Sequence, residues 1–159
     1  VRELASGLSG VGKMAEPQNL VSVVEKHILD QLPLKTIYIL ITAGLTYESI
    51  EPVRFIGNHS SGKMGYALAE AAASLGAQVK LISGPVSIKT NNEAIQVIDV
   101  GTAEEMYKAS HEFFNNCDIA ILSAAVADFT PKTVASQKIK KGKDCLTLAL
   151  AKTKDILTS

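Results

Sequence analysis

Four short apolar runs alternate with helical segments along the chain, and this alternation constrains the fold more than any other feature. The first run, residues 36–42, reads Thr-Ile-Tyr-Ile-Leu-Ile-Thr and is apolar on both faces, as expected of a parallel strand covered by helices on each side. Similar runs follow at residues 78–83, 95–100 and 118–123. Strands and helices in alternation favour right-handed crossovers. We therefore expect an α/β fold with a Rossmann-like, doubly wound, mostly parallel sheet and helices on both faces.

The helices between these runs carry their own boundary signals. Residues 62–75 form one predicted helix, which Gly76 ends as a C-cap. Another helix begins after Thr102, whose spacing from Glu105 fits a capping box. The first helix is expected to pack on the sheet through one apolar face, made of Met64, Ala67, Leu68, Ala71 and Leu75.

The N-terminal part of the chain follows a different pattern. Residues 1–17 are glycine-rich and typical of loops, and residues 18–32 repeat apolar side chains at helical spacing until Pro33. We expect residues 1–34 to form a separate loop and linker helix, and residues 35–159 to form the main domain. Because the chain lacks an initiating methionine and stops without turn chemistry, it is expected to be a piece of a longer protein, with the main domain truncated at its C-terminus.

The charge balance limits the classes of partner. Lysine plus arginine and aspartate plus glutamate both count 16, so the chain lacks the basic excess of nucleic-acid-binding proteins. No apolar run approaches membrane-spanning length and no signal peptide is visible, which indicates a cytoplasmic protein. Cys117 and Cys145 have no metal-ligand spacing and are expected to be reduced thiols. We therefore expect small-molecule partners, with neither nucleic acid nor membrane among them, and no side-chain metal site.

The stretch at residues 51–65, Glu-Pro-Val-Arg-Phe-Ile-Gly-Asn-His-Ser-Ser-Gly-Lys-Met-Gly, has the composition of an anion-binding loop. Its glycines let the backbone turn sharply and approach a ligand, and the helix that follows would point the positive end of its dipole at an anion. The hydroxyls of Ser60 and Ser61 add N-cap character. Arg54 and Lys63 bracket the loop with positive charge. The stretch therefore predicts a phosphate or carboxylate cradle.

Three familiar motifs of nucleotide-binding proteins are not matched by this sequence. Residues 57–63 fit G-x-x-x-x-G-K, but Met64 stands where a P-loop needs Ser or Thr to hold Mg²⁺. The first strand is followed by Ala-Gly-Leu-Thr at residues 43–46 rather than by the glycine fingerprint of dinucleotide-binding proteins. No tyrosine has a lysine four residues later, as a short-chain dehydrogenase requires. An NAD(P)-dependent Rossmann oxidoreductase is therefore a disfavoured alternative.

A second informative stretch, Ser-Ala-Ala-Val-Ala-Asp at residues 123–128, leaves the fourth strand. Its small residues leave room for a base or sugar. Asp128 can accept hydrogen bonds from amino or ribose hydroxyl groups, and it fits a helix cap or a solvated position equally well. Residues 129–143 then carry Lys138 and neighbouring lysines in a segment with little apolar pattern. Such a segment is either a mobile flap that closes on a polyphosphate or a solvated basic loop.

Together these motifs resemble phosphopantothenate–cysteine ligases, the ligase half of the bifunctional decarboxylase–ligase of coenzyme A biosynthesis. The resemblance covers residues 35–159 and rests on Ile-Thr-Ala-Gly at 41–44, the stretch at 51–65, Ala-Ala-Val-Ala-Asp at 124–128 and Lys-Ile-Lys-Lys at 138–141. Residues 4–17 resemble the substrate clamp that ends the decarboxylase half, with Ser6 where many relatives carry a proton-donating cysteine. FMN belongs to that half, and decarboxylation by this chain is not expected.

The resemblance implies a reaction that uses CTP, with Mg²⁺ held mainly by phosphate oxygens. The carboxylate of 4′-phosphopantothenate attacks the α-phosphate, pyrophosphate leaves, and the amine of L-cysteine displaces CMP from the acyl-cytidylate to give 4′-phosphopantothenoylcysteine. By motif, the catalytic residues are Asn58, which binds the acyl carbonyl, and Lys138, which acts on the triphosphate or on amide formation. Arg54 supports the loop or the pantothenate side as a substrate-binding residue. The implied nucleotide-binding residues are Gly44, Ser60, Ser61, Gly62, Ser123, Ala124, Asp128 and Lys138.

Two departures from the family pattern leave alternatives open. Tyr47 stands where relatives usually carry a basic residue, and the family's nucleotide-binding part continues beyond Ser159. A non-catalytic nucleotide-binding fragment is therefore an alternative to an active ligase. The family usually forms homodimers through this domain, within a larger oligomer when it is fused to the decarboxylase, so a homodimer is expected. The choice between CTP and ATP is open on the sequence.

Overall fold

The computed structural model describes residues 2–3, 9–10, 14–142 and 145–158, and the chain divides into two compact units, Val1–Pro33 and Leu34–Ser159. Ser6, the predicted replacement of the clamp cysteine, lies outside the described residues. The first unit contains the antiparallel pair β1 (Arg2–Glu3) and β2 (Ser9–Gly10), and helix α1 (Pro17–Asp30).

Helix α1 forms where helical spacing predicted it, although it ends two residues before the predicted end at residue 32. It begins with Pro17 in its first turn, where a missing N–H costs nothing. None of the described residues of α1 is buried, and its apolar side chains, among them Val23 at 67% exposure, face solvent within this unit. The helix is therefore amphipathic in sequence, but the described residues of its unit bury no face of it.

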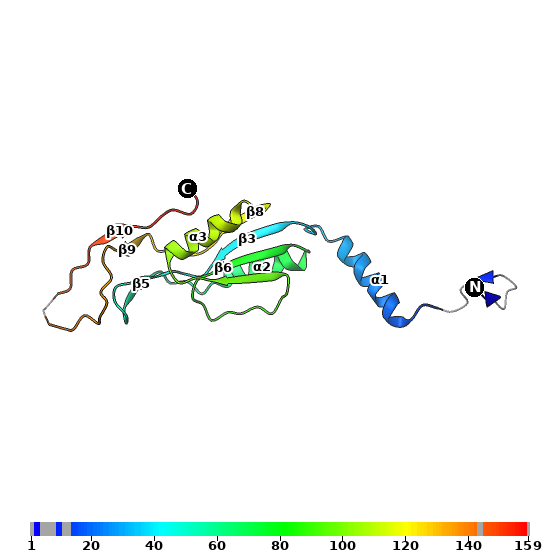
Figure 1. The fold of residues 1–159 in the computed structure, drawn as a ribbon, viewed down its shortest axis with the longest axis horizontal. Helices are drawn as coiled ribbons and strands as arrows, with labels where there is room; N and C mark the ends of the chain where they lie inside the picture. The colour runs from blue at the N-terminus through cyan, green and yellow to red at the C-terminus, as the bar shows by residue number, and fades with distance from the viewer. Residues whose placement is uncertain (1, 4–8, 11–13, 143–144, 159) are drawn as a thin grey trace. The chain divides into compact units, whose positions relative to one another are not determined.

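The second unit is built on a four-stranded parallel sheet in the order β7-β6-β3-β8 (Figure 1). In the register of the sheet, Ile41 lies opposite both Leu81 and Ile121. All four predicted strands are present, and the α/β, Rossmann-like class is confirmed. The strands are β3 (Tyr38–Ala43), β6 (Gln78–Ser83), β7 (Ile95–Asp99) and β8 (Ile119–Leu122).

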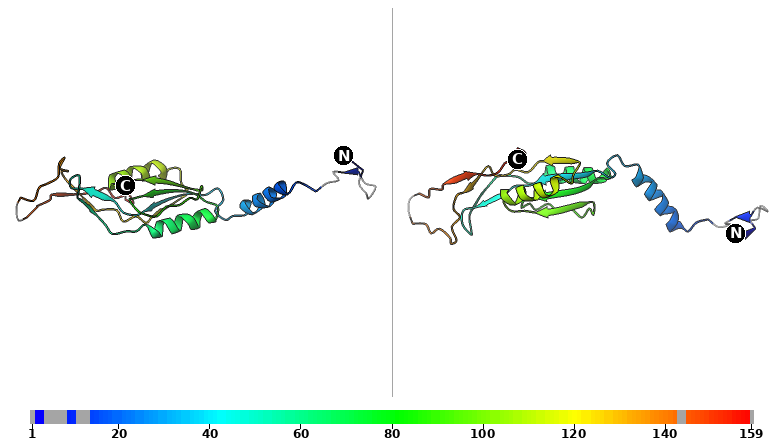
Figure 2. Two further views of the ribbon diagram at one scale, coloured as in Figure 1. Left: turned by 90° about the horizontal axis from the view of Figure 1, so that it is seen from below. Right: turned by 45° about the horizontal axis from the view of Figure 1, so that its top comes forward.

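Helices cover both faces of this sheet, as predicted (Figure 2). Side chains of a strand alternate between the faces. Ile39 and Ile41 of β3 therefore pack in the cluster that contains α2 (Lys63–Ser74), whereas Leu40 packs with Met106 of α3 (Ala103–Phe114). Both faces of β3 are buried from Ile39 onward, which explains why this strand has no polar face.

Helix α2 contacts the sheet through a different face from the one predicted. Its buried residues are Gly65, Tyr66, Ala69 and Ala72, while Met64 is 64% exposed. The helix lies so close to β3 that a Cβ at Gly65 would come within 2.5 Å of the Ala43 Cβ. No side chain fits at Gly65 itself, and Tyr66 and two alanines complete the buried face, whereas the predicted face with Met64 is exposed. The predicted C-cap is present, since Gly76 follows the helix with a φ of +98°.

Helix α3 begins with the predicted capping box. Thr102 Oγ1 accepts a hydrogen bond from the Glu105 N–H, and Glu105 Oε2 accepts one from the Thr102 N–H. A third hydrogen bond at the start of α3, from a distant residue, was not predicted. The buried carboxylate of Glu48 accepts a hydrogen bond of 2.8 Å from the Ala103 N–H, so a residue 55 positions earlier satisfies another amide of the first turn.

Besides the β1–β2 pair in the predicted N-terminal loop, two short antiparallel pairs in the second unit were missed in the predictions. The long loop expected at residues 43–61 contains β4 (Tyr47–Ser49) and β5 (Phe55–Gly57), and the rings of Tyr47 and Phe55 lie 3.9 Å apart. The expected irregular segment at 129–143 begins as β9 (Phe129–Pro131), which pairs with β10 (Leu150–Lys152). Strands of three residues are too short to show a period in the sequence. No helix in the described part of the chain is long and apolar enough to cross a membrane.

Gly65 provides a direct test of the packing between α2 and β3. Gly65→Ala would place a methyl against Ala43 and 2.9 Å from Ser123 Oγ, so we expect the free energy of unfolding to fall by about 1–3 kcal/mol through overpacking. Urea denaturation measures this change. Gly142→Ala is the control, because its added Cβ would meet nothing closer than Lys140 O at 3.9 Å. Equal effects of the two substitutions would contradict the packing argument.

Candidate functional site

Most of the predicted site residues gather at the carboxyl edge of the sheet, where ligands bind in folds of this class. Gly44 follows β3, Gly84 follows β6 and Ser123 follows β8. The loops from these strand ends meet, since Gly44 O accepts a hydrogen bond of 2.7 Å from the Ala125 N–H. The motifs after β3 and β8 are therefore neighbours in space.

Two glycines, Gly44 after β3 and Gly62 before α2, lie close together and form what we call the glycine floor of the site. Gly44 and Gly62 have φ angles of +81° and +74°, in the left-handed region that favours glycine. A Cβ would lie 2.9 Å from Val86 Cγ1 if added to Gly44, and 3.1 Å from the same atom if added to Gly62. Backbone conformation and lack of room therefore both require glycine here. Val86 had no distinguishing signal in the sequence.

The start of α2 corrects one prediction. Its N-cap is Gly62, with no side-chain hydrogen bond to the first turn, so Ser60 and Ser61 do not cap the helix. Ser60 Oγ instead accepts a hydrogen bond of 3.3 Å from the Gly62 N–H, and Ser61 is exposed. The left-handed turn at Gly62 takes the chain away from the extended conformation that a capping serine normally adopts.

Two buried threonines fasten the loop after β8 to the end of β3. Thr42 Oγ1 accepts hydrogen bonds from the N–H groups of Ser123 at 3.1 Å and Ala124 at 3.3 Å. Thr46 Oγ1 accepts one from the Ala127 N–H at 2.9 Å. The Ser123 hydroxyl donates to Thr42 O at 2.6 Å, so its proton is already engaged. These bonds fix the backbone of residues 123–127 against β3.

Asn58 lies against this fastened loop. Its Nδ2 donates to Val126 O at 2.8 Å and makes a longer contact of 3.5 Å with Ala125 O. Because both contacts are to carbonyl oxygens, they fix which end of the carboxamide is the nitrogen. The side chain is exposed, so the motif after β5 presents it to solvent beside the motif after β8.

A cavity of about 480 Å³ opens beside Asp128. Ala124 and Asp128 line it together with Lys152, the last residue of β10, and Lys154, which follows that strand. Thr153 brings these lysines here, because its hydroxyl donates to Ala127 O at 2.7 Å and its N–H donates to Asp128 O at 3.0 Å. Asp128 is exposed and caps no described helix.

A second group of charged residues surrounds Lys138. Glu51 is buried, and its Oε1 accepts a hydrogen bond of 3.0 Å from Arg54 Nε while its Oε2 accepts one of 2.8 Å from the Ile139 N–H. Arg54 Nη2 also donates to Ile139 O at 3.0 Å. A cavity of about 1140 Å³ adjoins this cluster and is lined by Arg54, Lys138, Lys140 and Lys141.

The Glu51 carboxyl stays ionised despite its burial. Desolvation raises its pKa, but the hydrogen bonds from Arg54 and from the Ile139 N–H, together with the positive charge of Arg54, outweigh that effect and hold the pKa below the ordinary 4.5. The ionised carboxylate can therefore accept both hydrogen bonds at neutral pH.

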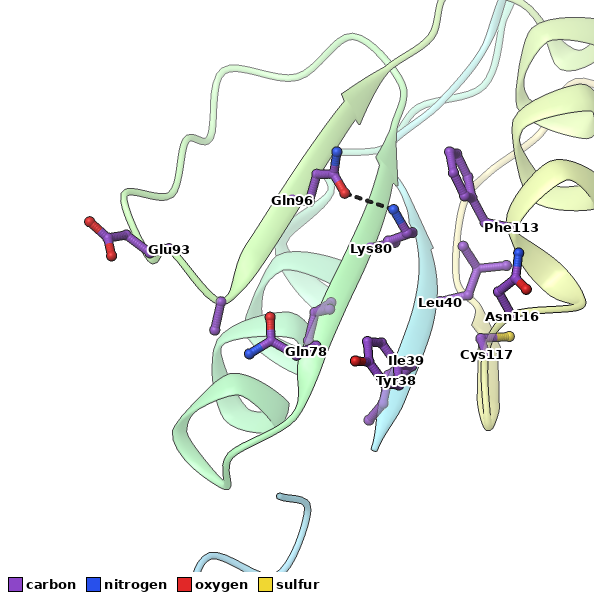
Figure 3. A pocket seen from close by; sticks show the side chains of 12 residues that line it. Tyr38, Ile39, Leu40, Gln78, Lys80, Glu93, Gln96, Phe113, Asn116 and Cys117 are labelled. Carbon is purple, nitrogen blue, oxygen red and sulfur yellow. Dashed lines mark hydrogen bonds between the residues drawn. The ribbon is translucent and has the colours of Figure 1, made fainter. Parts of the chain in front are cut away.

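A third cavity, of about 470 Å³, lies at the opposite, amino edge of the sheet (Figure 3). Lys80 is fixed there, since it donates to Gln96 Oε1 at 2.7 Å and lies 4.2 Å from the centre of the Phe113 ring. Cys117 also lines the cavity, and desolvation raises the pKa of its thiol, which disfavours the reactive thiolate. None of the predicted site residues lies here.

Comparison with known proteins identifies the family. Residues 34–159 match the DNA/pantothenate metabolism flavoprotein C-terminal domain.

The chain belongs to this family.

Curated relatives are similar over nearly the whole of this chain. The coenzyme A biosynthesis bifunctional protein CoaBC of Bacillus subtilis (strain 168) is 50% identical over 156 residues, which cover 97% of this chain and 38% of that protein. CoaBC of Escherichia coli (strain K12) is 46% identical over 156 residues, covering 96% and 38%. A cysteine/cysteine sulfinic acid decarboxylase from an unknown prokaryotic organism is 52% identical over 158 residues, covering 97% and 44%. The chain thus spans about two fifths of the length of these relatives.

Solved structures of the family have the same fold. The crystal structure of the C-terminal domain of CoaBC matches with a TM-score of 0.69 and 42% identity, covering 80% of this chain and 59% of that one. A Cab2 mutant in complex with phosphopantothenate-cysteine matches with a TM-score of 0.64 over 91% of this chain and 66% of that one. At 19% identity, the second match supports the fold alone.

Within this flavoprotein C-terminal domain, the predicted site residues fall into two groups. Arg54 and Lys138 line the larger cavity, which shares no described residue with the cavity beside Asp128. Thr42, Thr46 and Thr153, which hold the site together, were not predicted, because a threonine at a strand end gives no sign of its distant partner. The other group, at the carboxyl edge, contains Gly44, Asn58, Ser60, Ser61, Gly62, Ser123, Ala124 and Asp128.

Acid should weaken the contribution of Glu51 to stability. The pKa of Glu51 is lower in the folded chain than the ordinary value of 4.5 that applies in the unfolded chain. The ionised carboxylate therefore stabilises the folded state at pH values above 4.5, and this stabilisation is lost as the pH falls through the lowered pKa of the folded chain. We expect the difference in free energy of unfolding between wild type and Glu51→Gln to be larger at about pH 7 than at about pH 3. Urea denaturation at both pH values measures it. A difference independent of pH would contradict the assignment, and Arg54→Gln should reduce the pH dependence.

Proposed function

We propose that this domain joins 4′-phosphopantothenate to L-cysteine in a CTP-dependent reaction that forms 4′-phosphopantothenoylcysteine. The observation that carries the proposal is the attachment of Asn58 to the loop of residues 123–128, beside the glycine floor of Gly44 and Gly62. Membership of the family and the names of the CoaBC relatives, which refer to coenzyme A biosynthesis, support the same reaction.

The proposed reaction has two steps. A carboxylate oxygen of 4′-phosphopantothenate forms a bond with the α-phosphorus of CTP, and pyrophosphate leaves. The amine of L-cysteine then attacks the carbonyl carbon of the acyl-cytidylate, loses a proton and expels CMP. Both steps develop negative charge on oxygen, which nearby N–H groups and lysines stabilise. Mg²⁺ would be held by phosphate oxygens of the nucleotide, and among the described residues no group of three His, Cys, Asp or Glu side chains could hold it instead.

Asn58 would bind the acyl carbonyl during the second step. One hydrogen of Nδ2 is engaged by Val126 O, whereas the contact with Ala125 O at 3.5 Å is too long to engage the other strongly. That second N–H can donate to a carbonyl oxygen of the intermediate. Because the first bond fixes the carboxamide, the donor is oriented before the substrate arrives.

The nucleotide would lie across the carboxyl edge. The floor of Gly44 and Gly62 admits phosphate groups close to the backbone, with the hydroxyls of Ser60 and Ser61 beside it. Asp128 would accept hydrogen bonds from cytosine or ribose in its cavity, next to the small side chain of Ala124, and Ser123 would contribute from the residue before Ala124. Lys138 would act on the triphosphate, and Arg54 would support the loop that carries it, consistent with its bonds to Glu51 and Ile139.

The domain assignments follow from the same proposal. Residues 35–159 would be the ligase domain, and residues 1–34 the end of a decarboxylase clamp with a linker helix. FMN has no role in the proposed reaction. The domain would act as a homodimer on small-molecule substrates.

An assay of pyrophosphate release tests the reaction. The natural protein that carries this chain is incubated with 4′-phosphopantothenate, L-cysteine, Mg²⁺ and either CTP or ATP. We expect release with CTP that depends on phosphopantothenate, and product that depends on cysteine. Nucleotide binding without release would favour a non-catalytic nucleotide-binding module, and oxidation or reduction of a nicotinamide would favour the disfavoured oxidoreductase; either result would contradict the proposal.

Asn58→Asp separates the two steps. The carboxylate cannot donate to the acyl carbonyl and is repelled by Val126 O, so product formation should fall by about 100-fold or more while the acyl-cytidylate accumulates. Mass spectrometry of quenched reactions measures both species. Asn116→Asp, the same change at the amino-edge cavity, is the control and should leave turnover unchanged. Normal coupling of pyrophosphate release to product in Asn58→Asp would exclude the proposed role.

A further inference from the structure

Glu51 binds one partner within its own β4–β5 connection and one in a distant segment of the chain. Its side chain is fully buried, with one oxygen bound by Arg54 Nε and the other by the Ile139 N–H, 88 residues later in the chain. The bonds from one cation and one amide offset the cost of burying the carboxylate. Glu51 therefore anchors the backbone at Ile139 to the β4–β5 connection, and we call this contact the anchor.

Both peptide groups of Ile139 are held by this pair. Its N–H donates to Glu51, and its carbonyl accepts from Arg54 Nη2 at 3.0 Å. The same segment is attached again four residues earlier, where the Ala135 N–H donates to Ile50 O at 3.0 Å. A segment with little regular structure is thus fixed at two points on the loop between β4 and β5.

Resting on the proposed function, we infer that Glu51 is a positioning residue for Lys138. The fixed peptide of Ile139 directly follows Lys138 and directly precedes Lys140, and both lysines are exposed beside the cavity of about 1140 Å³. Anchoring the backbone between the two lysines removes most of the conformational freedom of an untethered loop. Lys138 is therefore oriented before a polyphosphate binds. Glu51 acts through Lys138 and does not itself touch the nucleotide.

The arrangement requires a carboxylate. Each oxygen of Glu51 faces an N–H donor, so both must be acceptors. In Glu51→Gln, the amide nitrogen would face one of these donors and lose its hydrogen bond. Glu48→Gln is a matched control, because Glu48 is also buried in the same hairpin but accepts from the Ala103 N–H.

Amide hydrogen exchange of Ile139, followed by NMR in the 159-residue chain, tests the anchor. We expect Glu51→Gln to speed this exchange by roughly ten- to hundredfold, with Glu48→Gln and the core amide of Leu81 unchanged. If Glu51→Gln fails to fold, Ile139→Pro removes the donor N–H from the other side, and exchange at Lys138 is measured instead. Exchange at wild-type rates in either variant would overturn the inference.

Pyrophosphate release in the natural protein tests whether the anchor acts through Lys138. Glu51→Gln should lower kcat by about tenfold or more, and Lys138→Gln should lower it further. The double variant should then match Lys138→Gln alone, because loss of the anchor can have no further effect once the lysine is absent. Additive losses would overturn the positioning role. Absence of release in the wild type would contradict the proposed function, whereas the exchange of Ile139 still decides the anchor.

Discussion

The hydroxyls of Thr42 and Thr46 determine how the two ends of the site meet. Each accepts a backbone N–H from a segment 81 residues later, and both threonines are buried. A buried N–H without a partner is costly, so residues 123–127 have little freedom to leave β3. Asn58 donates to this loop and therefore receives its position from two threonines that it does not contact.

The β4–β5 hairpin connects parts of the domain that are distant in sequence. Its buried acids satisfy N–H groups elsewhere: Glu48 that of Ala103 at the start of α3, and Glu51 that of Ile139. The Tyr47 N–H also donates to Gly101 O at 2.8 Å. The connection between β3 and α2 therefore binds several distant segments, namely the start of α3, Gly101 and the segment at Ile139. These contacts explain its length.

The sequence predicted those features that depend on local pattern. The four strands of the sheet, the capping box of Thr102 and the glycine after α2 follow from periodicity and turn chemistry. The face of α2 was wrong, because apolar size points to Met64, whereas the close approach to Ala43 requires Gly65 and turns Tyr66 and two alanines into the core. The short hairpins and the role of Glu51 were missed for a related reason. Strands of three residues show no period, and the partner of Glu51 lies 88 residues away, so a single sequence carries no record of either.

Gly44 and Gly62 illustrate how little variation the floor of the site can accept. Both would meet the same methyl group of Val86, and both also have positive φ angles. Trimming Val86 to alanine would remove the closest contact at both positions, but a side chain at Gly44 would still crowd the backbone of Gly84 at 3.2 Å, and the positive φ angles would remain. No single compensating change can therefore rescue a side chain at either glycine. Gly44 and Gly62 are therefore not expected to be replaced by single substitutions during evolution, whereas exposed residues near them can be.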